Sequence, residues 1–227
     1  DVIKRFVNAG RMAYEVGYDA VQLHAAHGFL LCNFVSPYSN KRTDEYGGDT
    51  QRRTKILVEI YDQLRDKVGK NFPITVKLQT QDGVPGGLTL EEGKEIAKIV
   101  ANAGYDAIEP SGGGGESMIR ESGIDGLPSR VIKSPEDENY FLPTVNEIKP
   151  IVNDCPVILM GGVRNPLSAE KVLREKAAEF ISMSRPLIYE PDLPNRWKNG
   201  DTSPALCTSC NECYMSVLKG ALHCICI

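Results

Sequence analysis

Two of the chain's three histidines, His24 and His27, lie three positions apart, where a short apolar run (residues 18–24) ends and a glycine turn begins. In parallel α/β proteins, side chains at the carboxyl end of a buried strand line the ligand site. Two imidazoles placed there can both donate hydrogen bonds to one oxygen of a bound molecule. We therefore interpret the pair as a site for a ligand oxygen. The alternative is a structural pair satisfied by backbone carbonyls.

The carboxyl-terminal segment carries a second group of reactive side chains. Five of the seven cysteines lie in the last 21 residues, in the order Cys207, Cys210, Cys213, Cys224 and Cys226. A secreted disulfide scaffold would spread its cysteines more evenly through a shorter chain. Three closely spaced thiolates and a fourth, Cys224, separated from them by ten residues, are typical of a [4Fe–4S] cluster. Structural zinc, which four thiolates also bind, and an unligated tail remain the alternatives.

The bulk composition limits the function classes. The chain has 227 residues, a formal net charge of -4 and 41% hydrophobic residues, which suits one large globular domain. We expect neither nucleic acid nor a membrane as partner, and a cytoplasmic location. The first residue is Asp1, so we expect the chain to be trimmed, processed or part of a longer protein.

Helical and extended patterns alternate along the chain. Helices are expected at 1–16, 49–68, 90–103, 143–152 and 168–175, and strands at 18–24, 72–78, 107–110, 156–160 and 180–184. This order predicts an α/β fold with a parallel sheet and crossover helices. A faint repeat, residues 15–22 against 102–109, favours a barrel. A TIM barrel needs eight strands, so either the closing strands precede residue 1 or the sheet is open.

Three strand ends carry features that suit a bound phosphate. A run of Ser111 and four glycines follows the third strand, Gly161 and Gly162 follow the fourth, and Ser184 and Arg185 follow the fifth. Glycines let the backbone approach a ligand, and free amides can face a phosphate. The last two strand ends matter most, because phosphate sites of such barrels usually lie there.

The stretch from His24 to Gly48 resembles the old yellow enzyme family of FMN-dependent oxidoreductases. The most specific matches are Ser36-Pro37, Asn40, Arg42-Thr-Asp44, Tyr46-Gly-Gly48 and Arg52. The resemblance covers essentially the whole chain and implies an eight-stranded TIM barrel, of which residues 1–200 would supply strands four to eight and their helices. Residues 201–227 would then form a cysteine-rich tail.

The resemblance also implies roles for individual residues. His24 and His27 would hold a substrate carbonyl over the flavin, and Lys77 would stand where the family usually has an arginine against flavin N1 and the C2 oxygen. The FMN phosphate would be held by Gly161, Gly162, Ser184 and Arg185, with Ser111 and Gly112 in a loop near it. The tail resembles that of larger members, such as trimethylamine dehydrogenase, in which a cluster exchanges single electrons with FMN.

One position departs from the family pattern. Phe29 stands where family reductases commonly have the tyrosine that protonates the substrate, and phenylalanine cannot donate a proton. Tyr140, expected in a loop over the barrel, is a candidate substitute. Arg42, Asp44 and Tyr46 are interpreted as structural residues that fix a long loop.

These observations predict an FMN-dependent, NAD(P)H-linked oxidoreductase that reduces an activated C=C bond of an α,β-unsaturated carbonyl or enoyl substrate. An amine-dehydrogenase-like or NADH-oxidase-like flavoprotein is the alternative within the same class. A non-catalytic, truncated half-barrel is the alternative from another class. The expected partner is a small-molecule substrate, and a homo-oligomer is left open.

Overall fold

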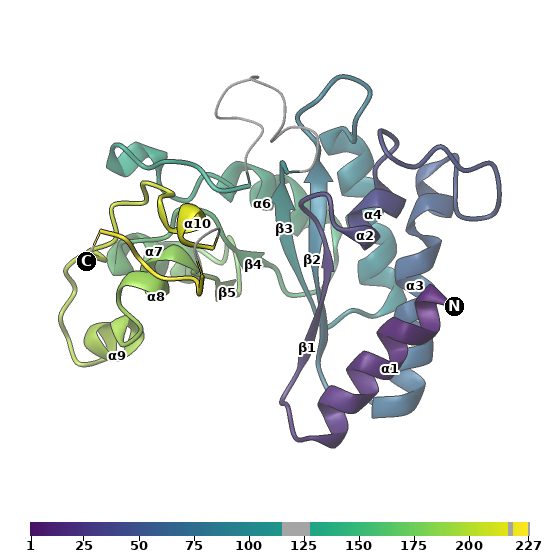
Figure 1. The fold of residues 1–227 in the computed structure, drawn as a ribbon, viewed down its shortest axis with the longest axis horizontal. Coiled ribbons are helices and arrows are strands. Elements are labelled where there is room, and N and C mark those ends of the chain that lie inside the picture. The colour runs from purple at the N-terminus through teal and green to yellow at the C-terminus, as the bar shows by residue number, and fades with distance from the viewer. Residues whose placement is uncertain (115–127, 218–219, 227) are drawn as a thin grey trace.

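A computed structural model describes residues 1–114, 128–217 and 220–226 of the chain. Its core is a set of parallel strands, each followed by a helix (Figure 1). The strands are β1 (Val21–Ala25), β2 (Ile74–Gln81), β3 (Ala107–Gly112), β4 (Ile158–Leu159) and β5 (Phe180–Ile181). The helices are α1 (Val2–Glu15), α2 (Leu30–Val35), α3 (Thr50–Val68), α4 (Leu90–Ala103), α6 (Leu142–Ile148), α7 (Pro166–Arg174), α8 (Arg185–Tyr189), α9 (Leu193–Lys198) and α10 (Cys213–Ser216), with short 3₁₀ turns at Pro135–Asp137 and Lys149–Ile151.

The strands follow one another in chain order and run parallel. β1, β2 and β3 form one sheet, β4 and β5 form a second, and a parallel bridge between Ile108 and Val157 joins the two. The five predicted strands are thus confirmed. The described residues form an open arc, not a closed barrel, because β1 and β5 are not paired with each other.

Successive side chains along each strand point to opposite faces of the sheet, one apolar and one polar. The outward side chains, such as Leu23, Val76 and Ile108, are buried and are covered by α1, α3 and α4, which lie on one side of β1–β3 in Figure 1. The inward side chains include His24 and Lys77, which are only partly buried. Burying the apolar face supplies the stability of the arc and leaves the polar face available for a site.

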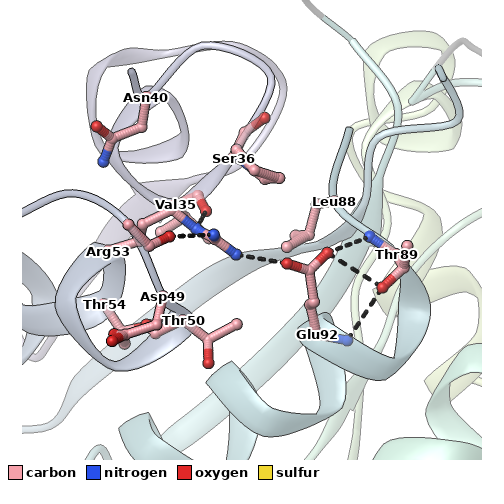
Figure 2. Close-up of polar contacts among 12 residues, drawn as sticks. Val35, Ser36, Asn40, Asp49, Thr50, Arg53, Thr54, Leu88, Thr89 and Glu92 are labelled. Carbon is pink, nitrogen blue, oxygen red and sulfur yellow. Dashed lines mark hydrogen bonds and ion pairs between the residues drawn. The ribbon is translucent and has the colours of Figure 1, made fainter. Parts of the chain in front are cut away.

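The long helices begin and end where the sequence predicts. α4 begins with a capping box, in which Thr89 Oγ1 accepts a hydrogen bond from the Glu92 amide and the Glu92 carboxylate accepts one from the Thr89 amide (Figure 2). Glu92 also accepts a hydrogen bond from Nη2 of buried Arg53 at 2.7 Å. The remaining guanidinium nitrogens of Arg53 donate to the carbonyls of Val35 and Gly48. One arginine therefore ties α2, α3 and α4 together beside the strand ends.

The loop between α2 and α3 is held by its own polar residues. Arg42 pairs with Asp44, and the Tyr46 hydroxyl donates to Glu59 at 2.8 Å. Nδ2 of Asn40 donates to the carbonyls of Phe34 and Tyr46. The structural interpretation of Arg42, Asp44 and Tyr46 is therefore confirmed.

Some elements differ from the sequence-based expectation. β2 extends to Gln81, beyond the expected residue 78, because Gln79 and Thr80 find hydrogen-bond partners that allow their burial. The helices α2, α8, α9 and α10 were not predicted. They are four to six residues long, and helices this short depend on tertiary contacts more than on sequence periodicity. Within the described ranges, no helix is long and apolar enough to cross a membrane.

Candidate active site

Three neighbouring strands place a row of polar side chains on the inner face of the sheet. His24 of β1 lies beside Lys77 of β2, and Lys77 lies beside Glu109 of β3. Lys77 Nζ is 2.6 Å from Glu109 Oε1, and Gln22 Nε2 donates to Glu109 Oε2 at 2.9 Å. The Glu109 side chain is only 3% exposed. Sequence reasoning selected Lys77 but missed that Glu109 supplies it with a counter-ion.

His27 lies just beyond the end of β1 in a left-handed backbone conformation, with φ of 62°. Its amide donates to Gln79 Oε1 at 3.0 Å, and its Nε2 lies 2.7 Å from Ser111 Oγ. Burial, aided by the neighbouring His24 and Lys77, lowers the pKa of His27 to about 4. The ring is therefore neutral at neutral pH and is fixed by two neighbouring strands.

His24 and His27 are brought together as predicted. Their ring centroids are 5.1 Å apart with an interplanar angle of 79°, and the Phe29 ring lies 4.8 Å from His24 on another side. Burial and the charge of Lys77 lower the pKa of His24 as well. The Nδ1 atom of His24 is buried and has no hydrogen-bond partner within the described part of the chain. Such an atom is usually satisfied by a ligand or by water.

A cavity of about 320 Å³ has His27 in its lining, whereas His24 does not line it. Its size lies at the lower end of the range for small-molecule sites. The predicted site residues that line it come from three strand ends, the middle of β2 and the loop before α6: His27, Lys77, Tyr140, Gly161, Gly162, Ser184 and Arg185. Predicted site residues as far apart in the chain as His27 and Arg185 thus share one cavity.

Two glycines form the wall of the cavity after β4. Gly161 has φ of 103° and Gly162 has φ of 77°. A Cβ atom on Gly161 would lie 2.7 Å from the rings of both Tyr140 and Phe141. Since other residues adopt such φ values only with strain, only glycine fits at these positions without strain and crowding.

Tyr140 lies against this glycine wall. Its amide donates to the Gly161 carbonyl at 3.0 Å, and its hydroxyl donates to the Pro128 carbonyl at 3.2 Å. The residue therefore shares the cavity with His27, while its hydroxyl is engaged elsewhere. Its role as a proton donor stays a prediction.

Two arginines lie at the same end of the cavity. Buried Arg185 uses Nη1 to donate to the carbonyls of Arg130 and Ser209 and to Asn211 Oδ1, at 2.6–2.9 Å. Arg164, which sequence reasoning missed, also lines the cavity, and its buried Nε has no hydrogen-bond partner within the described residues. Its position just after the glycines of 161–162 was the available signal.

Ser111 and Gly112 lie elsewhere than expected. They are the last residues of β3 rather than part of a loop, and neither lines the cavity. Ser111 bonds His27, and Gly112 is held closely by Gln81 and Phe141. The strand continues this far because Thr80 donates to the Ser111 carbonyl. Gly115, the last of the predicted glycine run, lies outside the described residues.

The tail brings its cysteines into one place. All five line a pocket of about 10 Å³ beside Arg185, and the Sγ atoms of Cys210 and Cys226 are 3.6 Å apart. Across the described ranges, however, no group of three or more His, Cys, Asp or Glu side chains is arranged to hold a metal ion. The predicted ligands are gathered, but they are not in a coordination geometry.

The NADH:flavin oxidoreductase / NADH oxidase family model matches residues 1–203. The chain belongs to this family. The membership confirms the resemblance drawn from residues 24–48. An NADH oxidase from Thermoanaerobacter brockii is 37% identical over 212 residues, covering 93% of the chain. A cinnamate reductase from Clostridium sporogenes is 31% identical over 236 residues, covering 96% of the chain.

A solved structure of a 2-naphthoyl-CoA reductase in complex with 2-naphthoyl-CoA superposes on 98% of the chain with a TM-score of 0.85 and 29% identity. The chain nevertheless spans only about a third of these family members: 31% of the NADH oxidase, 34% of the cinnamate reductase and 33% of the naphthoyl-CoA reductase.

Proposed function

We propose that this chain forms the flavin- and substrate-binding part of an FMN-dependent, NAD(P)H-linked oxidoreductase. One observation carries the proposal: a single cavity is lined by the glycine wall with Arg164 and Arg185, by Lys77, and by His27, whose ring lies 5.1 Å from that of His24. A phosphate, a ring system and a substrate oxygen need these three environments. FMN bound there would supply electron transfer between NAD(P)H and the acceptor.

The residues of the chain fit such a cofactor. Gly161 and Gly162 carry no side chain and have positive φ, so their backbone can approach a phosphate. The unpaired Nε of Arg164 is a buried donor next to it, and Arg185 adds a second fixed positive charge. Lys77 would place a cation beside the flavin ring, where negative charge accumulates on reduction.

The histidine pair would bind and polarise the acceptor. With the pKa values of both rings lowered, each imidazole is neutral and can donate from one nitrogen without transferring its proton. Two donors on a carbonyl oxygen draw electron density from its β-carbon, and one such donor contributes about 3 kcal/mol to transition-state stabilisation. Ser111 and Gln79 would hold His27 in place for this task.

We infer that the acceptor is an activated C=C bond. The similarity to a cinnamate reductase and a naphthoyl-CoA reductase favours an α,β-unsaturated acyl substrate. The second candidate is an NADH-oxidase activity, favoured by the 37% identical relative and by Phe29, which puts an apolar ring against His24 where a proton donor would be needed. Tyr140 would need a different rotamer to serve as that donor, because its hydroxyl faces Pro128.

We propose further that the tail binds a [4Fe–4S] cluster through Cys207, Cys210, Cys213 and Cys224. The convergence of these thiols on one pocket beside Arg185 supports the proposal. Cys226 lines the same pocket, so Cys224→Ser and Cys226→Ser variants would identify the fourth ligand. Iron and acid-labile sulfide should be present in anaerobically purified protein and lost in Cys213→Ser, but kept in Cys155→Ser. Zinc without sulfide would contradict the cluster.

The central experiment is reconstitution of the complete gene product with FMN. The expected result is a bound flavin with its visible absorption bands, bleached by NADH or NADPH under anaerobic conditions and restored by cinnamate or an enoyl thioester. Restoration by oxygen alone would favour the NADH-oxidase candidate. A protein that does not bind FMN would contradict the proposal.

A further inference from the structure

Glu109 is a buried carboxylate that the proposed reaction does not use. It lies buried on the inner face of β3, in the same row as Lys77 and His24. Its two oxygens are both occupied, Oε1 by Lys77 Nζ at 2.6 Å and Oε2 by Gln22 Nε2 at 2.9 Å. The carboxylate is therefore fixed in position and shielded from water.

Its charge acts on the same groups that face the cavity. Lys77 lines the cavity, and the Lys77–Glu109 pair reduces the net charge at this point of the lining from +1 to about zero. Because both side chains are largely buried, water screens this pair less than it would an ion pair on the surface. The Glu109 charge also reaches His24, whose pKa it raises against the opposing effect of Lys77.

We propose that Glu109 lowers the reduction potential of the bound flavin by neutralising Lys77 and holding its ammonium group toward β3. The inference rests on the proposed function, in which Lys77 faces the flavin ring. Reduction adds negative charge to that ring. An unpaired Lys77 would stabilise this charge, and a Lys77 paired with Glu109 stabilises it less. Glu109 is thus a positioning residue, acting by its hold on Lys77 and by the charge that it adds to the pair.

Four proteins that differ in the net charge of the Lys77–Glu109 pair test this inference. The values are 0 for the wild type, +1 for Glu109→Gln, -1 for Lys77→Gln and 0 for the double variant. The midpoint potential of bound FMN, measured by spectroelectrochemical titration of the complete gene product, should be highest in Glu109→Gln, lowest in Lys77→Gln and intermediate in the other two. The expected rise in Glu109→Gln corresponds to roughly tenfold tighter relative binding of reduced FMN, or about 30 mV.

The matched control is Glu92→Gln. It also removes a carboxylate from an ion pair with a largely buried cation, Arg53, but on the helical layer outside the sheet (Figure 2). Its potential should equal that of the wild type, although the protein loses stability. If Glu109→Gln does not fold, the potentials of the other three proteins still test the inference. Lys77→Gln should have the lowest potential, and the wild type and the double variant, which leaves no unpaired charge, should have higher ones.

Failure of this inference can be distinguished from failure of the proposed function. Bound FMN with equal potentials in the wild type, Glu109→Gln and Lys77→Gln would overturn the inference and leave the proposed function standing. A wild-type protein that binds no FMN would overturn both. A shift in Glu92→Gln as large as that in Glu109→Gln would show a general effect of stability and would also overturn the inference.

Discussion

The hydroxyl of Ser111 lies 2.7 Å from Nε2 of His27, so the end of β3 fixes a ring that follows β1. The Ser111→Ala variant removes this bond, which is worth about 1 kcal/mol. We expect the FMN-loaded protein to bind 4-hydroxybenzaldehyde roughly fivefold more weakly, measured by titration of the flavin charge-transfer band. Ser168→Ala, which removes a hydroxyl bonded to the Asn165 carbonyl, should bind normally. Equal affinity in the wild type and Ser111→Ala would contradict the proposed orientation of His27.

The His24→Ala/His27→Ala variant tests whether the pair binds the acceptor rather than the cofactor. Each donor is worth about 3 kcal/mol on a developing oxyanion. The variant should lose the phenol charge-transfer band at all accessible ligand concentrations while the flavin absorption is retained. Loss of the flavin itself would show that the pair is structural.

The lowered pKa of His27 makes stability depend on pH. The unfolded residue takes up its proton near pH 6.5 and the folded one near 4, so the unfolded state binds more protons between these values. The free energy of unfolding should therefore fall as the pH drops from about 6.5 to about 4, by roughly 3 kcal/mol from this residue alone. Urea unfolding at several pH values measures the slope.

The matched variant is His27→Asn, because asparagine tolerates the left-handed backbone at this position. Carboxylates whose pKa values are lowered by their partners, such as Glu92, also lose stabilisation in acid. Only the difference between the two proteins therefore reports on His27, and the variant should show the shallower dependence. Parallel curves would contradict the buried, neutral state of the ring.

Alanine substitutions at Gly161 and Gly200 distinguish the stability cost of backbone strain from that of crowding. Both have positive φ, 103° and 96°, but a Cβ on Gly161 would meet two aromatic rings whereas one on Gly200 would meet nothing within 4 Å. Gly200→Ala should cost about 1 kcal/mol from strain alone. Gly161→Ala should cost a further 1–3 kcal/mol or so from overpacking and weaken FMN binding. Urea unfolding and FMN fluorescence titration measure the two effects, and equal losses would contradict the crowded wall.

Much of the fold could be predicted because long amphipathic helices and apolar strands carry their own periodicity. α4 was predicted at its observed bounds, with Thr89 as its cap. The ends of β2 could not be predicted, since Gln79 and Thr80 look like loop residues until neighbouring strands satisfy them. α2 and the helices after β5 lack enough length to show a period.

The sequence by itself determined which side chains are candidates for the site: His24, His27 and the glycines of 161–162 by their places at strand ends, and Lys77 by the family resemblance. Only the tertiary structure decided what each of them faces. Parallel register set Glu109 beside Lys77 and Ser111 against His27, and the folded tail set the Ser209 carbonyl and the Asn211 side chain against Arg185. The reason is that strand order and register bring together residues far apart in the chain, and no local pattern records which partner lies across.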